Sequence, residues 1–320
     1  MLTKMLFAIG IILIALVMSF FGFKEVVDVM TMARLDYIAL AIGLQFAILL
    51  LLALRLILLS RKYQHLGFVE AFKVSMSGMA VSMITPIAKI GGEPLKIYLL
   101  KKKLKGSQAT AVIAVDTLAE LASSLLVVFL VFMLFAREIP GVLASSFAIF
   151  LVVIAAIIIL GLKLLLNPRW MRKLVNWTTR RISRFAHVKK KDYAELFYNA
   201  FQILIRDRSL VAGAFGVSFV TKLLEFARMW LVFAAISVFL PADVIVIVWS
   251  VILVLYLVPW LPGSLGLVEF FGAGALVFFG LTSSAAAGGL LLDRFISYWF
   301  VLILGLAIMT TMPLPKRLKK

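Results

Sequence analysis

The sequence predicts an all-α polytopic membrane protein, and three observations support this fold class. Hydrophobic residues make up 64% of the 320 residues. Many apolar runs are long enough, or nearly so, to cross about 30 Å of hydrocarbon as a helix. The polar and apolar alternation of a membrane β-barrel is not found. The apolar runs are 5–23, 36–59, 108–136, 142–166, 209–240, 242–261, 264–281 and 283–312.

Positive charge is concentrated in loops and indicates the topology. The net charge is +18, and between residues 163 and 208 twelve Lys or Arg stand against three acidic residues. Further basic clusters lie at 61–73, 101–105 and 316–320. Because such clusters mark the cytoplasmic side, we interpret the charge as a topology signal and expect no nucleic-acid partner. The pattern predicts integration into the cytoplasmic membrane with both termini inside and a mixed-charge loop, 24–36, outside.

Residue types that bind metals or form disulfides are scarce. The chain has no cysteine, and its two histidines, His65 and His187, fall in polar loops. Its longest hydrophilic stretch, 167–208, is too short for a conventional soluble catalytic domain. The sequence therefore predicts no metal, no cofactor and no enzymatic activity.

The first interrupted segment reads SMITPIAKIGGEPLK, residues 82–96. It lies between two basic clusters separated by about 30 residues, which is too few for two full spans. We therefore expect a re-entrant hairpin, with a helix from about 71 to 84, an unwound stretch, and a shorter helix beginning at Pro94. We call residues 86–94 the first break; its expected hinge residues are Pro86, Gly91, Gly92 and Pro94.

A second interrupted segment, VPWLPGSLGLVEF, occupies residues 258–270. We call residues 259–269 the second break. In each break a glutamate follows a proline by seven residues, and an aspartate follows the glutamate by 23 residues in the first case and 24 in the second. These matched spacings predict a duplication. The expected hinge residues of the second break are Pro259, Pro262, Gly263 and Gly266.

The expected organisation is a single membrane domain, 1–320, with about six full spans and two hairpins. It contains a first repeat, 70–136, a basic amphipathic cytoplasmic segment, 167–208, and a second repeat of inverted orientation, 242–312. Inverted repeats with broken helices are typical of alternating-access transporters. Unwound backbone at membrane depth must face protein or a water-filled cavity. The pattern therefore predicts a central charged cavity.

Charged residues at membrane depth are costly and so are candidates for function. Glu93 and Glu269 close the two breaks, where each carboxylate either caps free amides of the returning helix or contacts a ligand or proton directly. Asp116 and Glu120 share one helix face. They either satisfy buried charge, with Arg294, Lys89 or each other's hairpin as partners, or carry a proton or a coupling ion.

The second repeat and the preceding span carry further charged candidates. Asp293 and Arg294 occupy the helix that corresponds to the one with Asp116. In the run 209–240, Lys222, Glu225 and Arg228 are spaced by three residues and form a structural triad or, with Lys89, part of an anion-attracting wall. Lys96 lies near the start of the returning helix. Arg55 is expected to extend to lipid headgroups. The candidate substrate-binding residues are Lys89, Glu93, Lys96, Asp116, Glu120, Lys222, Glu225, Arg228, Glu269, Asp293 and Arg294.

The basic segment 167–208 is expected to form two interfacial helices. Tyr193, Leu196, Phe197, Ala200, Phe201 and Leu204 follow helical spacing and form an apolar stripe. A basic amphipathic helix of this kind lies on an anionic leaflet. It serves either as a topology anchor or to gather anionic lipid.

The two breaks and the helices after them resemble the membrane domain of lysylphosphatidylglycerol synthases. The resemblance rests on Pro86 to Lys105 with the following AVDTLAE, and on LPGSLGLVE with the following LLLDR, and it covers roughly residues 5–312. It implies a flippase-like module that moves an aminoacylated phospholipid between leaflets, a module that stand-alone members without the soluble synthase domain share.

Three functions fit these observations. The first is transport of an anionic or polyprenyl-phosphate-linked lipid between leaflets through the charged cavity, with membrane phospholipid and the anionic leaflet surface as partners. The second is a membrane-embedded subunit of a lipid-modifying transferase that uses Glu93, Asp116 and Glu269 as acid or base groups. The third is a carrier of small ions or amino acids.

Overall fold

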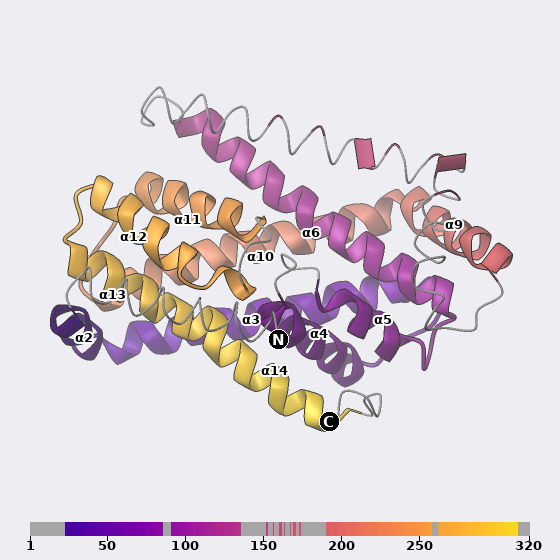
Figure 1. Cartoon of the computed structure of the whole chain (residues 1–320), viewed down its shortest axis with the longest axis horizontal. Helices are drawn as coiled ribbons and strands as arrows, with labels where there is room; N and C mark the ends of the chain where they lie inside the picture. The colour runs from indigo at the N-terminus through magenta and orange to yellow at the C-terminus, as the bar shows by residue number, and fades with distance from the viewer. Residues whose placement is uncertain are drawn as a thin grey trace. The chain divides into compact units, whose positions relative to one another are not determined.

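The computed structural model describes residues 23–85, 91–135, 190–257 and 262–312, with isolated positions between 152 and 173. Within these ranges all regular structure is helical (Figure 1). The predicted spans 5–23 and 142–166 lie almost entirely outside the described residues. The α-helices are α2 (Phe23–Thr31), α3 (Leu35–Ser60), α4 (Phe68–Ile84), α5 (Glu93–Leu100), α6 (Gly106–Phe135), α9 (Lys190–Arg206), α10 (Arg208–Ala235), α11 (Ala242–Leu257), α12 (Leu267–Phe278), α13 (Ser283–Arg294) and α14 (Phe300–Thr310).

Four of the predicted apolar runs form helices long enough to cross a membrane. These are Leu35–Ser60, Gly106–Phe135, Arg208–Ala235 and Ser283–Thr310. The last is α13 and α14 joined through η2 (Phe295–Trp299), a π-helical turn. The helical class and the membrane character predicted from the sequence are therefore confirmed.

The runs 242–261 and 264–281 form shorter helices. α11 has 16 residues and α12 has 12, fewer than the roughly 20 that a full crossing requires. Between them lies η1 (Pro262–Ser264), a single 3-10 turn. These lengths favour a re-entrant pair over two complete spans, although the re-entrant arrangement itself stays a prediction.

The prediction of a loop over 24–36 is wrong, because α2 occupies most of it. Val26, on one side of this short helix, is fully buried, whereas Lys24 and Glu25 are exposed. α2 packs against α13, where Gly288 leaves room for Val29. Polar and apolar residues are mixed along α2 because only one face of the helix is buried.

The described chain divides into two compact units. The first comprises residues 1–54, 68–96 and 219–320, and the second comprises 55–67 and 97–218. α3 and α10 each contribute residues to both units. Charged candidates from both breaks belong to the first unit, and Asp116 and Glu120 belong to the second.

Close packing of α4 against α14 organises the first unit (Figure 1). At Gly305 a Cβ atom would lie 2.7 Å from the carbonyl oxygen of Met76, so the two backbones approach closely. Small residues at such crossings are typical of membrane helices. Leu49, Met76 and Val301 form a buried cluster beside this crossing.

Packing of α6 against α9 organises the second unit. Phe197, Phe201 and Leu204 of the predicted stripe are buried, and the Tyr193 and Thr110 hydroxyls lie 2.8 Å apart. Leu196 was wrongly placed on that stripe, because it is 53% exposed. The stripe therefore faces α6 instead of an open leaflet surface. The other interfacial helix expected in segment 167–208 lies largely outside the described residues.

Polar contacts outside the spans also stabilise the second unit. Lys62 pairs with Asp207 at 2.5 Å, and this hydrogen bond lowers the pKa of Asp207. Tyr63 donates to the carbonyl of Ala200 in α9, and burial raises the pKa of its hydroxyl to about 12. These two contacts hold the residues after α3 against α9 and against Asp207, which follows α9.

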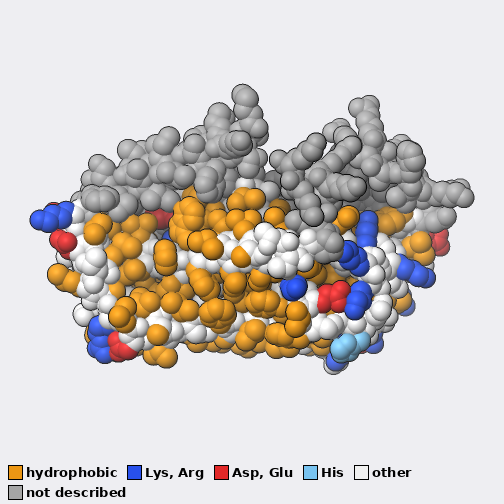
Figure 2. Space-filling model, turned by 90° about the horizontal axis from the view of Figure 1, so that it is seen from below, with side chains coloured by type: hydrophobic (Ala, Val, Ile, Leu, Met, Phe, Trp, Pro, Cys, Tyr) orange, Lys and Arg blue, Asp and Glu red, His pale blue; other side chains and the backbone are white. Residues whose placement is uncertain are grey.

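The remaining surface of the spans is largely apolar. Figure 2 shows hydrophobic side chains over most of the described surface in view, with charged side chains in a few groups. Leu50, Phe129, Leu223 and Ile303 are exposed although they lie within span-length helices. Apolar residues on the outside of long helices are what contact with lipid requires.

Candidate functional site

The first break begins where predicted. α4 ends at Ile84 and α5 starts at Glu93, with Pro94 in its first turn. Pro86 and Lys89 lie outside the described residues, so their predicted roles stay predictions. The amide of Gly92 donates to Ser82 Oγ at 2.8 Å. A Cβ atom on Gly92 would lie 1.8 Å from the carbonyl oxygen of Gly78, which explains the glycine there.

The C-terminal turn of α4 is capped by side chains. The last four carbonyls of a helix have no partner within it, and water is absent from the hydrocarbon. Thr85 Oγ1 donates to the carbonyls of Val81, at 2.9 Å, and Ser82, at 3.3 Å. The helix therefore ends in an ordered, hydrogen-bonded way. At Gly91 a Cβ atom would collide with the Thr85 side chain.

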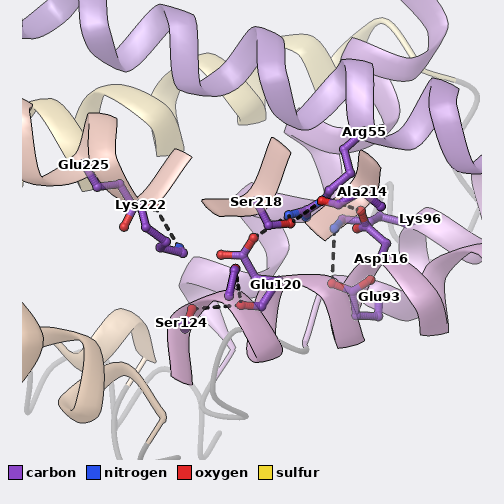
Figure 3. Close-up of polar contacts among 11 residues, drawn as sticks. Arg55, Glu93, Lys96, Asp116, Glu120, Ser124, Ala214, Ser218, Lys222 and Glu225 are labelled. Carbon is purple, nitrogen blue, oxygen red and sulfur yellow. Dashed lines mark hydrogen bonds and ion pairs between the residues drawn. The ribbon is translucent and has the colours of Figure 1, made fainter. Parts of the chain in front are cut away.

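Glu93 and Lys96 form an ion pair within the first turn of α5 (Figure 3). Glu93 Oε1 lies 3.1 Å from Lys96 Nζ, and the two side chains are 13% and 14% exposed. The stem of Lys96 passes over Gly78, where a Cβ atom would lie 2.4 Å from Lys96 Cγ. A carboxylate at a helix start is favoured by the helix dipole. The two residues that sequence analysis selected are thus brought together.

The second break is held by a cap on α12. Gly263 and Gly266 have φ values of 57° and 81°, a region that favours glycine. The Gly266 amide donates to Glu269 Oε2 at 2.7 Å, so the capping interpretation of Glu269 is confirmed. Ser264 Oγ donates to the carbonyl of Leu255 in α11. Pro262 opens η1; Pro259 lies outside the described residues.

Arg294 holds the second break from α13. Its Nε donates to Glu269 Oε1 at 2.8 Å, and its other two nitrogens donate to Tyr256 Oη at 2.6 Å and to the carbonyl of Gly263 at 2.7 Å. The side chains of Arg294 and Glu269 are 2% and 1% exposed. The predicted pairing of Arg294 with Asp116 or Glu120 is wrong. Arg294 instead supports the backbone of the second break at the Gly263 carbonyl.

Arg228 binds the neighbouring aspartate of α13. Its guanidinium donates hydrogen bonds to both carboxylate oxygens of Asp293, at 2.9 and 3.2 Å, and to Gln45 Oε1 at 2.6 Å. Bidentate pairs of this kind are the strong form of the interaction. In the predicted triad, Lys222 and Glu225 pair at 3.0 Å, with the Lys222 side chain fully buried.

Arg55 lies within the second unit and not at a headgroup. Its side chain is 4% exposed, with Nε 2.6 Å from Asp116 Oδ1 and Nη1 2.6 Å from Glu120 Oε2. Nη1 also donates to Ser218 Oγ at 2.6 Å (Figure 3). The prediction that Arg55 extends to headgroups is therefore wrong. The signal that could have revealed it is the i, i+4 spacing of two acids on α6, which required a cation on a neighbouring helix.

These arrangements are charge pairs and not metal sites. Within the described ranges no group of three or more His, Asp or Glu residues could hold a metal ion. Sequence reasoning missed Gln45, Tyr256 and Ser218 as partners of the three buried arginines, because single polar residues in apolar helices carry no distinguishing pattern.

Comparison with known proteins agrees with this architecture. A family model described as the lysylphosphatidylglycerol synthase TM region matches residues 5–305. A UPF0104 membrane protein of Methanothermobacter thermautotrophicus is 26% identical over 325 residues, covering 94% of this chain and 93% of the relative. A UPF0104 membrane protein of Methanocaldococcus jannaschii is 24% identical, covering 95% and 93%.

A third relative comes from another archaeal genus. The UPF0104 membrane protein of Pyrococcus horikoshii is 21% identical over 322 residues, covering 94% of both chains. The family match therefore extends over both breaks and over the helices that carry the three buried arginines. The chain belongs to the family of the lysylphosphatidylglycerol synthase transmembrane region.

Proposed function

We propose that this protein moves an anionic or polyprenyl-phosphate-linked lipid between the two leaflets of the membrane. The observation that carries the proposal is the first break, where α5 begins with a paired Glu93 and Lys96. Broken helices that place a helix start and charged side chains inside the membrane are the binding elements of many transporters.

An inverted repeat is part of the proposal. Each copy has a helix, a break and a shorter helix with glutamate in its first turn: α4 and α5 in one, α11 and α12 in the other. Each is followed by a span-length helix that carries a buried aspartate, Asp116 or Asp293. The shared order supports a duplication. In this account the two copies rock against each other around a charged cavity.

The headgroup contact is an exchange of partners at Lys96. A lipid phosphate is an anion like the Glu93 carboxylate and takes its place beside the Lys96 ammonium, near the amides at the start of α5. Glu93 and Lys96 are both more exposed than Arg294 and Glu269.

Reconstitution into vesicles tests the proposal. Fluorescent phosphatidylglycerol and fluorescent phosphatidylcholine are placed in both leaflets, and a membrane-impermeant quencher reports how fast each becomes accessible. We expect protein-dependent exchange that favours the anionic lipid. Lys96→Gln should weaken this preference about tenfold or more, because a charge-assisted hydrogen bond is lost.

The matched control is Lys101→Gln, which removes an exposed cation just after α5 and should leave the preference unchanged. Exchange no faster than in protein-free vesicles would contradict the proposal and favour a transferase subunit or a small-ion carrier. If lipid moves at equal rates in wild type and Lys96→Gln, lipid transport is retained. The replacement of Glu93 by a lipid phosphate at Lys96 is then excluded.

A further inference from the structure

Tyr298 contacts the second break and the last turn of α4, which leads into the first break. It lies in η2 and is 2% exposed. Its hydroxyl donates to the carbonyl of Met83, in the last turn of α4, at 3.0 Å. Its ring lies against Gly263, where a Cβ atom would come within 2.1 Å of Tyr298 Cε2. All three residues belong to the first compact unit.

The hydrogen bond to Met83 completes the C-terminal cap of α4. Thr85 already donates to the carbonyls of Val81 and Ser82. Tyr298 supplies a donor to the next carbonyl from a helix more than two hundred residues away in sequence. An unsatisfied carbonyl is costly where no water can reach it. The end of α4, and so the beginning of the first break, is fixed by a residue of the second repeat.

The ring of Tyr298 is fixed in turn by the second break. The Arg294 guanidinium lies 4.9 Å from the ring centroid, and the same guanidinium holds Glu269 and the Gly263 carbonyl. Leu265, within the second break, is fully buried in one cluster with Ala80 and Tyr298. η1 also contacts α4 directly. A shift of the second break therefore displaces the ring.

The helix that carries Tyr298 is itself irregular. Phe295–Trp299 form a π-turn between α13 and α14. Such turns are rare and occur mostly as local insertions at functional positions. This one separates the Asp293 and Arg294 ion pairs from α14, whose face packs on α4.

We infer that Tyr298 is a positioning residue through which the second break sets the conformation of the first. Its hydroxyl holds the end of α4, and its ring follows Gly263 and Arg294. When the second break changes, the hydrogen bond to Met83 breaks or forms and the first break opens or closes with it. The inference rests on the proposed function only in its last step, that this coupled opening serves lipid passage.

A single cysteine reports on the first break without interference, since the chain contains no other. Ile84→Cys is placed at the partly buried end of α4, and its rate of modification by a maleimide is measured in lipid nanodiscs. Tyr298→Phe should raise the rate about fivefold through loss of one buried hydrogen bond. Gly263→Ala should raise it similarly, and both substitutions together should raise it no further, because they remove the same contact.

Two controls separate coupling from general loosening. Ser250→Ala removes a buried hydroxyl that donates within α11 and should leave the rate unchanged. Leu265→Ala should raise the rate, whereas Leu276→Ala, an equally buried leucine of α12, should not. The leucine pair keeps the test decisive even if a Tyr298 or Gly263 variant fails to fold.

Independent, multiplying effects of Tyr298→Phe and Gly263→Ala would overturn the inference, as would equal effects of the two leucine variants. No lipid transport is needed for this measurement. Coupled labelling without lipid exchange would therefore leave the inference standing while removing the proposed function.

Discussion

The two breaks share a sequence pattern but are stabilised in different ways. In the second, Arg294 reaches from α13 to Glu269 and to the Gly263 carbonyl, and the ion pair is almost completely buried. In the first, Glu93 pairs with Lys96 of its own helix and is partly accessible. The difference follows from the residue after the matched aspartate. It is Arg294 after Asp293 but Thr117 after Asp116.

This comparison indicates a division of roles between the two breaks. A buried ion pair between helices fixes a break, because its separation leaves an uncompensated charge at membrane depth. A pair within one helix leaves its partners able to exchange. Under the proposed function, the second break is the anchored one and the first makes the headgroup contact, with Tyr298 between them.

The largest expected effect separates the two glutamates. Glu269→Gln leaves Arg294 buried without its counter-charge and should lower the free energy of unfolding by about 3–5 kcal/mol. Glu93→Gln should cost less, because Lys96 is more accessible than Arg294 and its pair lies within one helix. Denaturant titration of both variants in mild detergent measures the difference.

A double replacement identifies the cause of the large effect. Glu269→Leu combined with Arg294→Met removes both charges and should recover part of the stability lost in Glu269→Gln. Equal losses in Glu269→Gln and Glu93→Gln would remove the distinction between an anchored and an exchangeable break.

The glycines test how closely the first break is packed. Gly92→Ala places a methyl group against the Gly78 backbone and should destabilise the protein by about 1–3 kcal/mol, as overpacking does. Gly274→Ala, in α12, meets open space and should stabilise by up to about 1 kcal/mol, because alanine is the better helix former. Thermal unfolding of the two variants gives opposite shifts if the packing is as described.

A smaller effect is expected from the serine at the end of α4. Ser82→Ala removes the acceptor of the Gly92 amide and should cost about 1 kcal/mol. Ser250→Ala is the matched control, since it removes a buried hydroxyl without touching either break. If both serines give the same loss, the Gly92 contact contributes nothing specific to the first break.

The smallest effect concerns pH and lies outside both breaks. Lys62 lowers the pKa of Asp207 below its ordinary value of 3.8 in the folded protein. The stabilisation by this pair is therefore complete above the ordinary pKa and is lost as the pH falls through the lowered one. Asp207→Asn should flatten this part of the stability curve. If Asp207→Asn leaves the loss of stability at acid pH unchanged, that loss arises from other carboxylates.

Residue patterns predicted much of this structure because membrane helices obey simple rules. Span positions followed from apolar length, and the end of α4 and the start of α5 followed from prolines and glycines. The Glu269 cap was predictable because a carboxylate in a first turn accepts from free amides.

Ion-pair partners could not be predicted in the same way. Arg55 was placed wrongly because it lies near the end of α3, which suggested a contact with lipid headgroups. In the structure it pairs with Asp116 and Glu120 of α6. Arg294 was assigned to the wrong acids because spacing along one helix does not reveal which helix lies opposite. Contacts such as Tyr298 with Met83 depend on tertiary packing alone.

Hydrogen–deuterium exchange in nanodiscs tests the division of roles most directly. Peptides containing residues 91–96 and 263–269 are compared in zwitterionic lipid and in lipid that contains phosphatidylglycerol. We predict faster exchange in the first break, slowed by the anionic lipid, and slow exchange in the second regardless of lipid. Equal protection of both breaks with no response to anionic lipid would contradict the account.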